Sequence, residues 1–252
     1  MTPAHSRKKP ETDAAARRTP ARSLPAGLDE AELTGPVEDY LKAIYELERT
    51  GGAAGTNDLA THLGVAPASV TGMVRRLAEQ GLLTHERYRG VRLTPRGRLG
   101  ALRTLRRHRV IEAYLVRALG FRWDEVHDEA ERLEHAASND LINRMAEAMG
   151  EPTVDPHGAP IPSREGSVEE LWYRTLSELE PGATADVMRV EDEDPELLRY
   201  LAELTIMPGS VVRMIERAPF GGPITLEVDN RSRQIGPALA ERILVRPRLQ
   251  RP

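Results

Sequence analysis

The apolar positions of the chain first become periodic after Thr34-Gly-Pro36. From there to Gly81 they recur three and four residues apart, which predicts a long helix, a short helix over residues 57–63 and a further helix from Pro67. The positions that carry this pattern are Val37, Tyr40, Leu41, Ile44, Tyr45, Leu59, Ala60, Leu63, Val70, Met73, Val74 and Leu77. Residues 82–84 and 91–94 are typical of two short strands around a tip at 88–90. This order of elements predicts a winged helix-turn-helix.

The helix from Pro67 has a polarity that favours DNA binding over an arbitrary small helical domain. It opens with small and polar residues, which permit close approach to base edges, and ends with arginines, which suit phosphates. The wing adds further arginines. The predicted DNA-binding residues are Ala66, Ala68, Ser69, Thr71, Gly72, Arg75, Arg76, Arg89 and Arg92.

The rest of the chain divides into a helical part and a β-rich part. Apolar spacing predicts a long helix from Pro95 to Leu119, a charged helix over 124–137 and an amphipathic helix over 139–149. A proline-rich connector follows. Four short apolar runs after it, with one helix inserted, predict a small β-barrel of about 75 residues. We expect a tail at 1–32, a winged helix-turn-helix at 33–98, a helical dimerisation and metal-binding domain at 99–150, a connector at 151–175 and the barrel at 176–250.

The composition of the chain excludes several classes of protein and of metal site. Residues 1–28 carry six Lys or Arg against two acids, so the predicted disordered tail is basic although the net charge of the chain is −4. There is no cysteine, which excludes disulfides, thiolate zinc sites and iron–sulfur clusters. No run approaches the ~20 apolar residues of a membrane span, and the N-terminus lacks an apolar signal segment. We therefore expect a cytoplasmic protein without a membrane partner.

The charged helix holds the strongest candidate chemistry. Glu131, Glu134 and His135 lie three and four residues apart, so they project from one face, and Asp39 on the first long helix is their natural partner. A second set combines His108 and Glu112 with His127. Carboxylates with imidazoles suit Mn²⁺ or Fe²⁺, although the general affinity order favours Zn²⁺ or Ni²⁺. The residues alone leave two interpretations open: metal sites, or a solvated face with contacts between residues four apart.

Several stretches resemble the diphtheria toxin repressor family of metal-dependent repressors. They are Glu38-Asp-Tyr-Leu-Lys-Ala-Ile-Tyr-Glu-Leu47, Ala68-Ser-Val-Thr-Gly-Met-Val-Arg-Arg-Leu77, Tyr88-Arg-Gly-Val-Arg-Leu-Thr-Pro-Arg-Gly97, Arg107-His-Arg109, Val126-His-Asp-Glu-Ala130, Glu134-His135 and Pro156-His-Gly-Ala-Pro-Ile-Pro162. The resemblance covers about residues 33–165, and the C-terminal barrel is similar to the SH3-like domain that such repressors often carry.

The resemblance implies a mainly α fold with a small β part, and a homodimer that binds a pseudo-palindromic operator in double-stranded DNA when loaded with divalent metal. It places the primary site on Asp39, Glu131, Glu134 and His135. It places the ancillary site on His108, Glu112 and His127, completed by an acidic residue of the barrel, for which Asp194 aligns best.

The same resemblance favours Mn²⁺. Iron-responsive members usually have Met and Cys where this chain has Asp39 and Glu131, whereas manganese-responsive members have Asp and Glu. Fe²⁺ is the alternative, and Zn²⁺, Co²⁺ or Ni²⁺ can substitute in vitro. The short manganese regulators carry a further ligand glutamate where this chain has Lys42, which argues against a closely spaced metal pair.

The expected function is metal-dependent repression of metal homeostasis genes, without enzymatic activity or a small-molecule substrate. Two other interpretations compete with it. A di-metal hydrolase would use the same carboxylates, but the sequence offers no nucleophile or catalytic base. A regulator whose barrel senses a small molecule would hold a purely structural metal.

Overall fold

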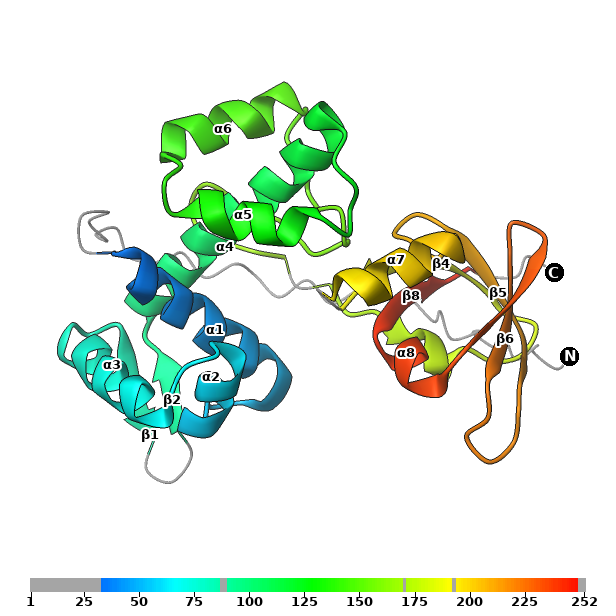
Figure 1. The fold of residues 1–252 in the computed structure, drawn as a ribbon, viewed down its shortest axis with the longest axis horizontal. Coiled ribbons are helices and arrows are strands. Elements are labelled where there is room, and N and C mark those ends of the chain that lie inside the picture. Colours follow the sequence, from blue (N-terminus) through cyan, green and yellow to red (C-terminus); the bar gives the residue numbers. More distant parts are fainter. Residues whose placement is uncertain (1–32, 87–89, 170, 192–193, 249–252) are drawn as a thin grey trace, which may run out of the picture.

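The computed structural model describes residues 33–86, 90–169, 171–191 and 194–248. These residues form a winged helix-turn-helix, a helical domain and an SH3-like domain, as Figure 1 shows. The expected mainly α fold with a small C-terminal β domain is confirmed. The predicted basic tail at 1–32 and the predicted DNA-binding residue Arg89 lie outside the described residues.

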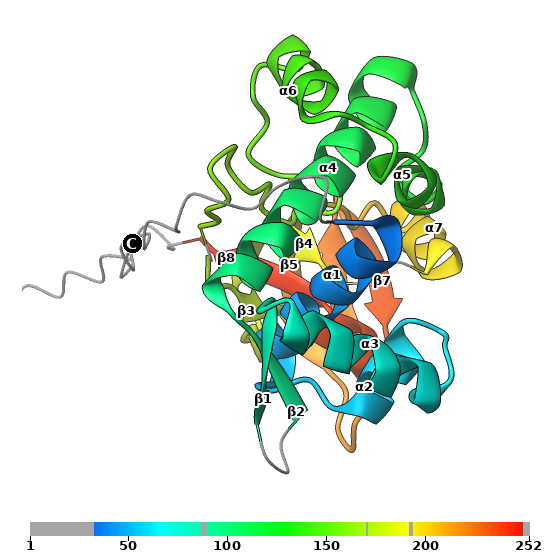
Figure 2. The same ribbon diagram turned by 90° about the vertical axis from the view of Figure 1, so that its left-hand side faces the viewer.

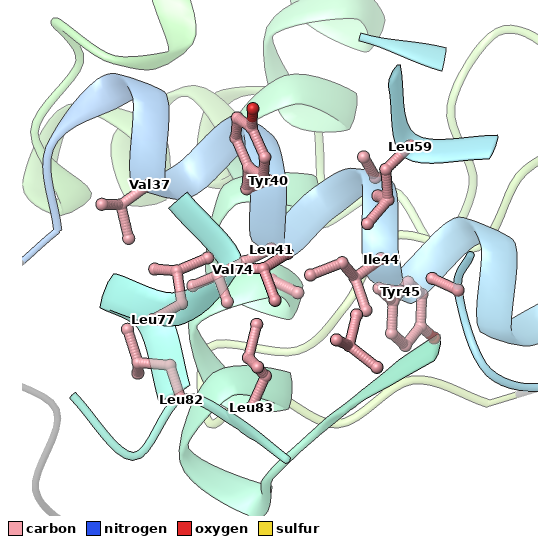
Figure 3. Close-up of a cluster of buried hydrophobic side chains, with 14 of the residues drawn as sticks. Val37, Tyr40, Leu41, Ile44, Tyr45, Leu59, Val74, Leu77, Leu82 and Leu83 are labelled. Atoms are coloured by element: carbon pink, nitrogen blue, oxygen red, sulfur yellow. The ribbon is translucent and has the colours of Figure 1, made fainter. Parts of the chain in front are cut away.

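The winged helix-turn-helix consists of α1 (Gly35–Gly51), α2 (Thr56–His62), α3 (Pro67–Glu79), β1 (Leu83–Glu86) and β2 (Gly90–Leu93). The apolar stripes of the three helices meet in one core, as expected from their spacing. Figure 3 shows Leu41 and Ile44 of α1 facing Leu77 of α3 and Leu83 of β1. This core fixes the orientation of α3 relative to α1 and leaves the opposite face of α3 exposed to solvent.

The wing is tied to the helices by backbone hydrogen bonds. Val91 and Ala54 exchange two bonds of 2.9 Å, which adds Ala54 to the edge of the β1–β2 pair. Gly90 has φ +114°, and a Cβ there would lie 2.1 Å from the carbonyl oxygen of Ala54. Only glycine therefore allows this close approach.

The helical domain is built on α4 (Pro95–Leu119), with α5 (Val126–Glu134) and α6 (Asn139–Ala148) packed against it. The Thr94 hydroxyl caps the first turn of α4 by accepting a bond from the Gly97 N–H, and Gly120, at φ +74°, ends the helix. The N-terminal half of α4 packs on α1, so one helix belongs to two domains (Figure 2). No helix among the described ranges is both long and apolar enough to span a membrane.

The C-terminal domain is a six-stranded antiparallel sheet in the order β3-β8-β4-β5-β6-β7. Its elements are β3 (Arg174–Thr175), a 3₁₀ turn η2 (Leu176–Glu178), β4 (Thr184–Val190), α7 (Pro195–Glu203), β5 (Val211–Arg217), β6 (Ile224–Val228), β7 (Arg231–Ile235), α8 (Pro237–Glu241) and β8 (Ile243–Pro247). The apolar pattern predicted β4, β5, β6, β8 and α7 but missed β3, β7 and α8.

The connector before this domain packs on β4. The Val190 N–H donates to the carbonyl of His157 at 2.9 Å. Gly158, at φ +86°, lies so close that a Cβ would be 2.0 Å from the Met188 carbonyl oxygen. The connector thus holds its own residues Asp155 and His157 between β4 and α4.

Candidate metal centre and DNA-binding surface

A cleft of about 850 Å³ lies between α1, α4 and α5 on one side and the connector and β4 on the other. Most of the residues that line it are charged or polar. Six of the eight predicted metal ligands line it: Asp39, His108, Glu112, His127, Glu131 and Asp194. Glu134 is buried behind the wall, where it contacts His108. Within the described chain, the histidines and carboxylates of this region form three groups close enough to hold an ion.

The first group joins Asp39 of α1 to Glu134 and His135 at the end of α5. One ligand atom from each lies within 4.8 Å of the others. His135 Nε2 is 2.8 Å from Asp39 Oδ1 and 3.6 Å from Glu134 Oε1. The other ring nitrogen, Nδ1, is 2.7 Å from Glu38 Oε2, which orients the ring. This group bridges the DNA-binding and helical domains.

The second group consists of His108, His127 and Glu131. His108 Nδ1 lies 3.6 Å from Glu131 Oε1, and His127 Nε2 lies 4.0 Å from the same oxygen. Glu112 Oε1 is 3.1 Å from His108 Nε2 and 3.8 Å from His127 Nδ1. Glu131 was expected with Asp39, but its carboxylate lies in this second group, where it also contacts Lys42.

A third group, Glu112, Asp155 and His157, was missed from the sequence. All three residues are buried. His157 Nδ1 lies 3.8 Å from Glu112 Oε1, while Asp155 Oδ1 accepts bonds from the backbone N–H groups of His157 and Ala159. The signal was the Asp155-Pro-His157 turn, which was read as part of a proline-rich connector and of a matching stretch but not as a source of ligands.

The electrostatics of the groups are strongly coupled. Burial disfavours the charged form of His108, but Glu112 and Glu134, hydrogen bonded to its two ring nitrogens, outweigh burial and raise its pKa to about 10. Burial would raise the pKa values of Glu112 and Glu134, yet the His108 contact lowers both. Burial raises the pKa of Asp39, against the opposing effects of His135 and Lys42.

The donor set fits a hard or borderline divalent cation. It offers carboxylate oxygens and imidazole nitrogens without sulfur. Asp39 Oδ1 supplies a second indication: it is buried and accepts no hydrogen bond from the described residues, although His135 Nε2 is close. Buried polar atoms normally have a partner, so this pair is arranged as two ligand atoms would be.

Asp194 lines the cleft, as an ancillary ligand would. It also begins α7, where its Oδ1 accepts a bond from the Glu196 N–H at 2.9 Å. This cap engages one of its two carboxylate oxygens.

The predicted DNA-binding residues on and before α3 form one exposed surface, on the outside of the molecule in Figure 1. Seven of them are exposed: Ala66, Ala68, Ser69, Thr71, Gly72, Arg75 and Arg76. Arg92, on β2, is half-buried. The core side chains Val70, Val74 and Leu77 occupy the opposite face of the helix.

Three family models match the chain. They are the iron dependent repressor N-terminal DNA binding domain over residues 32–91, the iron dependent repressor metal binding and dimerisation domain over 94–163, and the FeoA domain over 174–247. The iron-dependent repressor IdeR of Mycobacterium tuberculosis is 34% identical over 203 residues, which are 76% of this chain and 88% of that protein. The chain belongs to the iron-dependent repressor family.

Manganese regulators are also similar to this repressor. The HTH-type transcriptional regulator MntR of Lysinibacillus sphaericus is 38% identical over 116 residues, 46% of this chain and 83% of that one. A solved structure described as a manganese-dependent transcriptional repressor in complex with manganese has 41% identity and a TM-score of 0.77, covering 83% of this chain and 98% of its own. The protein is thus a metal-dependent transcriptional repressor of a non-enzymatic family, which excludes the hydrolase interpretation.

Proposed function

We propose that this repressor responds to Mn²⁺ and, when loaded, binds a pseudo-palindromic operator as a homodimer. One observation carries the proposal: Asp39 of the DNA-binding domain meets His135 of the helical domain with 2.8 Å between their ligand atoms. The oxygen and nitrogen donors and the solved manganese-bound relative support Mn²⁺. The ligands proposed for the primary site are Asp39, Glu131, Glu134 and His135, and those for the ancillary site His108, Glu112, His127 and Asp194.

A bound divalent cation would neutralise the facing carboxylates of the two domains. Without it, Asp39, Glu131 and Glu134 repel one another across the domain boundary, apart from what Lys42 and the histidines offset. Asp39 is rigidly attached to α1, whose apolar face holds α3. A fixed position of Asp39 relative to α5 therefore fixes the direction of α3, and operator binding selects the dimer whose two copies of α3 match successive major grooves.

The helical domain carries exposed apolar side chains that suit a dimer interface. Four large ones are exposed at the end of α4 and on α5 and α6, namely Leu119, Phe121, Leu133 and Leu141. We propose that these side chains contribute to the contact between the two copies.

Titration of the metal-free protein with Mn²⁺, Fe²⁺ and Zn²⁺ under anaerobic conditions tests the choice of metal. The probe is a labelled duplex selected from random-sequence DNA. We expect Mn²⁺ to promote binding at the lowest free concentration. A lower midpoint concentration for Fe²⁺ would favour iron as the physiological metal. The similarity to the iron-dependent repressor IdeR supports that alternative. Binding that no metal stimulates would contradict metal sensing and favour a small-molecule signal.

The variant Asp39→Ala tests the bridging ligand. We expect it to fold and dimerise but to lose metal-stimulated operator binding, because no side chain of α1 then reaches the cation from that position. Binding is measured by fluorescence anisotropy and dimerisation by light scattering. Glu203→Ala, which removes an exposed carboxylate of α7, is the matched control and should bind as the wild type does. Metal-stimulated binding retained by Asp39→Ala would count against the bridge.

A further inference from the structure

Lys42 is the one lysine within the described ranges, and it lies inside the metal cleft. It is one turn after Asp39 on α1, and its side chain is only 12% exposed. Its ammonium donates to Glu134 Oε1 at 2.9 Å and also contacts Glu131. Glu134 belongs to the first ligand group and Glu131 to the second. A fixed positive charge therefore stands between the two groups that are suited to a cation.

Both carboxylate oxygens of Glu134 already have a partner in the protein. Its side chain is 0% exposed, so water cannot solvate it. Its Oε1 accepts from Lys42, and its Oε2 lies 2.6 Å from His108 Nδ1. A buried carboxylate needs such partners, because an unpaired charge in the interior is costly. Lys42 thus neutralises the negative charges of Glu134 and Glu131, as a bound metal ion would.

From these contacts we infer that Lys42 competes with the divalent cation for Glu131 and Glu134, and so sets the metal concentration at which the repressor becomes loaded. The inference rests on the proposed function, since it concerns the same ligands. Binding of a metal through either carboxylate has to weaken its bond to the ammonium, and the lysine then has to move into the cleft. That exchange costs free energy, which makes the overall binding of the metal weaker.

The competition is tested by Lys42→Met, which keeps the length of the side chain and removes its charge. Mn²⁺ affinity is measured against a fluorescent chelator, the number of bound ions by equilibrium dialysis and the metal-free Tm by circular dichroism. Charge-assisted hydrogen bonds contribute enough that we expect roughly tenfold tighter Mn²⁺ binding or more. The metal-free Tm should fall, because Glu131 and Glu134 lose their cation, and added Mn²⁺ should raise it further than in the wild type.

Two variants serve as comparisons. Lys42→Arg retains the charge and should return the affinity towards that of the wild type. Arg132→Met removes an exposed positive charge from α5, the helix of the ligands, without touching them, and should leave the affinity unchanged. Lys42→Gln is measured in parallel, so that a folding defect of the methionine variant does not decide the result.

The outcomes separate this inference from the proposed function. Tighter binding by folded Lys42→Met or Lys42→Gln, reversed in Lys42→Arg, supports competition. Equal or weaker binding by the folded neutral variants, in a protein whose wild type binds Mn²⁺, overturns the competition alone and makes Lys42 an organiser of the site. A wild type that binds none of Mn²⁺, Fe²⁺ and Zn²⁺ overturns both.

Discussion

His108 stands between two acidic neighbours on α4 and α5. Glu112 Oε1 is 3.1 Å from its Nε2 and Glu134 Oε2 is 2.6 Å from its Nδ1. Both carboxylates have lowered pKa values because of this contact, against the effect of their burial. The metal-free protein therefore holds His108 as an imidazolium, and loading the site with metal has to release that proton.

This arrangement predicts a pH dependence of the metal-free stability. The pKa of His108 rises from 6.5 in the unfolded chain to about 10 in the folded one. Its contribution is complete below pH 6.5 and is lost as the pH rises towards 10, with a slope of up to about 1.4 kcal/mol per pH unit. Urea unfolding in chelator between pH 6.5 and 9.5 should show this decline in the wild type and a flatter profile in His108→Gln. Equal slopes in the two proteins would contradict the pairing.

The residues proposed as metal ligands were predictable to different degrees. Asp39, Glu134 and His135 were expected together, because Glu134 and His135 share a helix face, and Asp39 on the first helix was named as their partner from the residues and again from the resemblance. Lys42 was judged only as a residue unable to bind metal, and its ion pairs with Glu131 and Glu134 depend on the packing of α1 against α4 and α5. No local pattern shows such a contact between residues about ninety positions apart.

Helix α3 is the element that we propose contacts the bases of the operator. Its start is small and uncharged, and its C-terminal half carries Arg75 and Arg76 on the exposed side. Arg75 Nε donates to Glu79 at 3.0 Å in a solvent-exposed pair, which is a weak restraint. Both arginines can therefore turn towards phosphates.

Arg76→Ala should weaken operator binding about equally for all sequences and lower the slope of log K against log salt by about one, because one phosphate contact is lost. Anisotropy titrations at several salt concentrations measure this slope. Arg213→Ala, at an exposed position of β5 in the SH3-like domain, is the control and should leave it unchanged. An unaltered slope in Arg76→Ala would remove Arg76 from the interface.

The elements that could be predicted from the sequence were those with a strong apolar periodicity. The helix predicted from Pro95 to Leu119 has those bounds in the structure. Strand β7 was missed because four of its five residues, Arg231 to Gln234, are polar and it lies at the edge of the sheet, where only Ile235 is buried. Strand β3 was missed because two residues are too few for a pattern, and its pairing with β8 is a long-range contact.

At the scale of the molecule, the cleft is where the three domains meet. Arg199 of α7 contacts Asp124 of the helical domain at 3.2 Å, and His157 Nε2 lies 2.8 Å from the Trp123 carbonyl oxygen. Arg49 of α1 lies 3.9 Å from Glu191, beside β4. A change in the charge of the cleft therefore acts on all three domains. Asp39 connects the cleft to α1, the helix that positions α3.

The account depends on Asp39 and His135 sharing one cation. Anomalous diffraction at the manganese edge from crystals of the Mn²⁺-loaded protein tests this directly. We predict an anomalous peak within coordination distance of both Asp39 Oδ1 and His135 Nε2, with Glu134 as a further ligand. Full occupancy by manganese elsewhere, with Asp39 turned away from His135, would contradict the account.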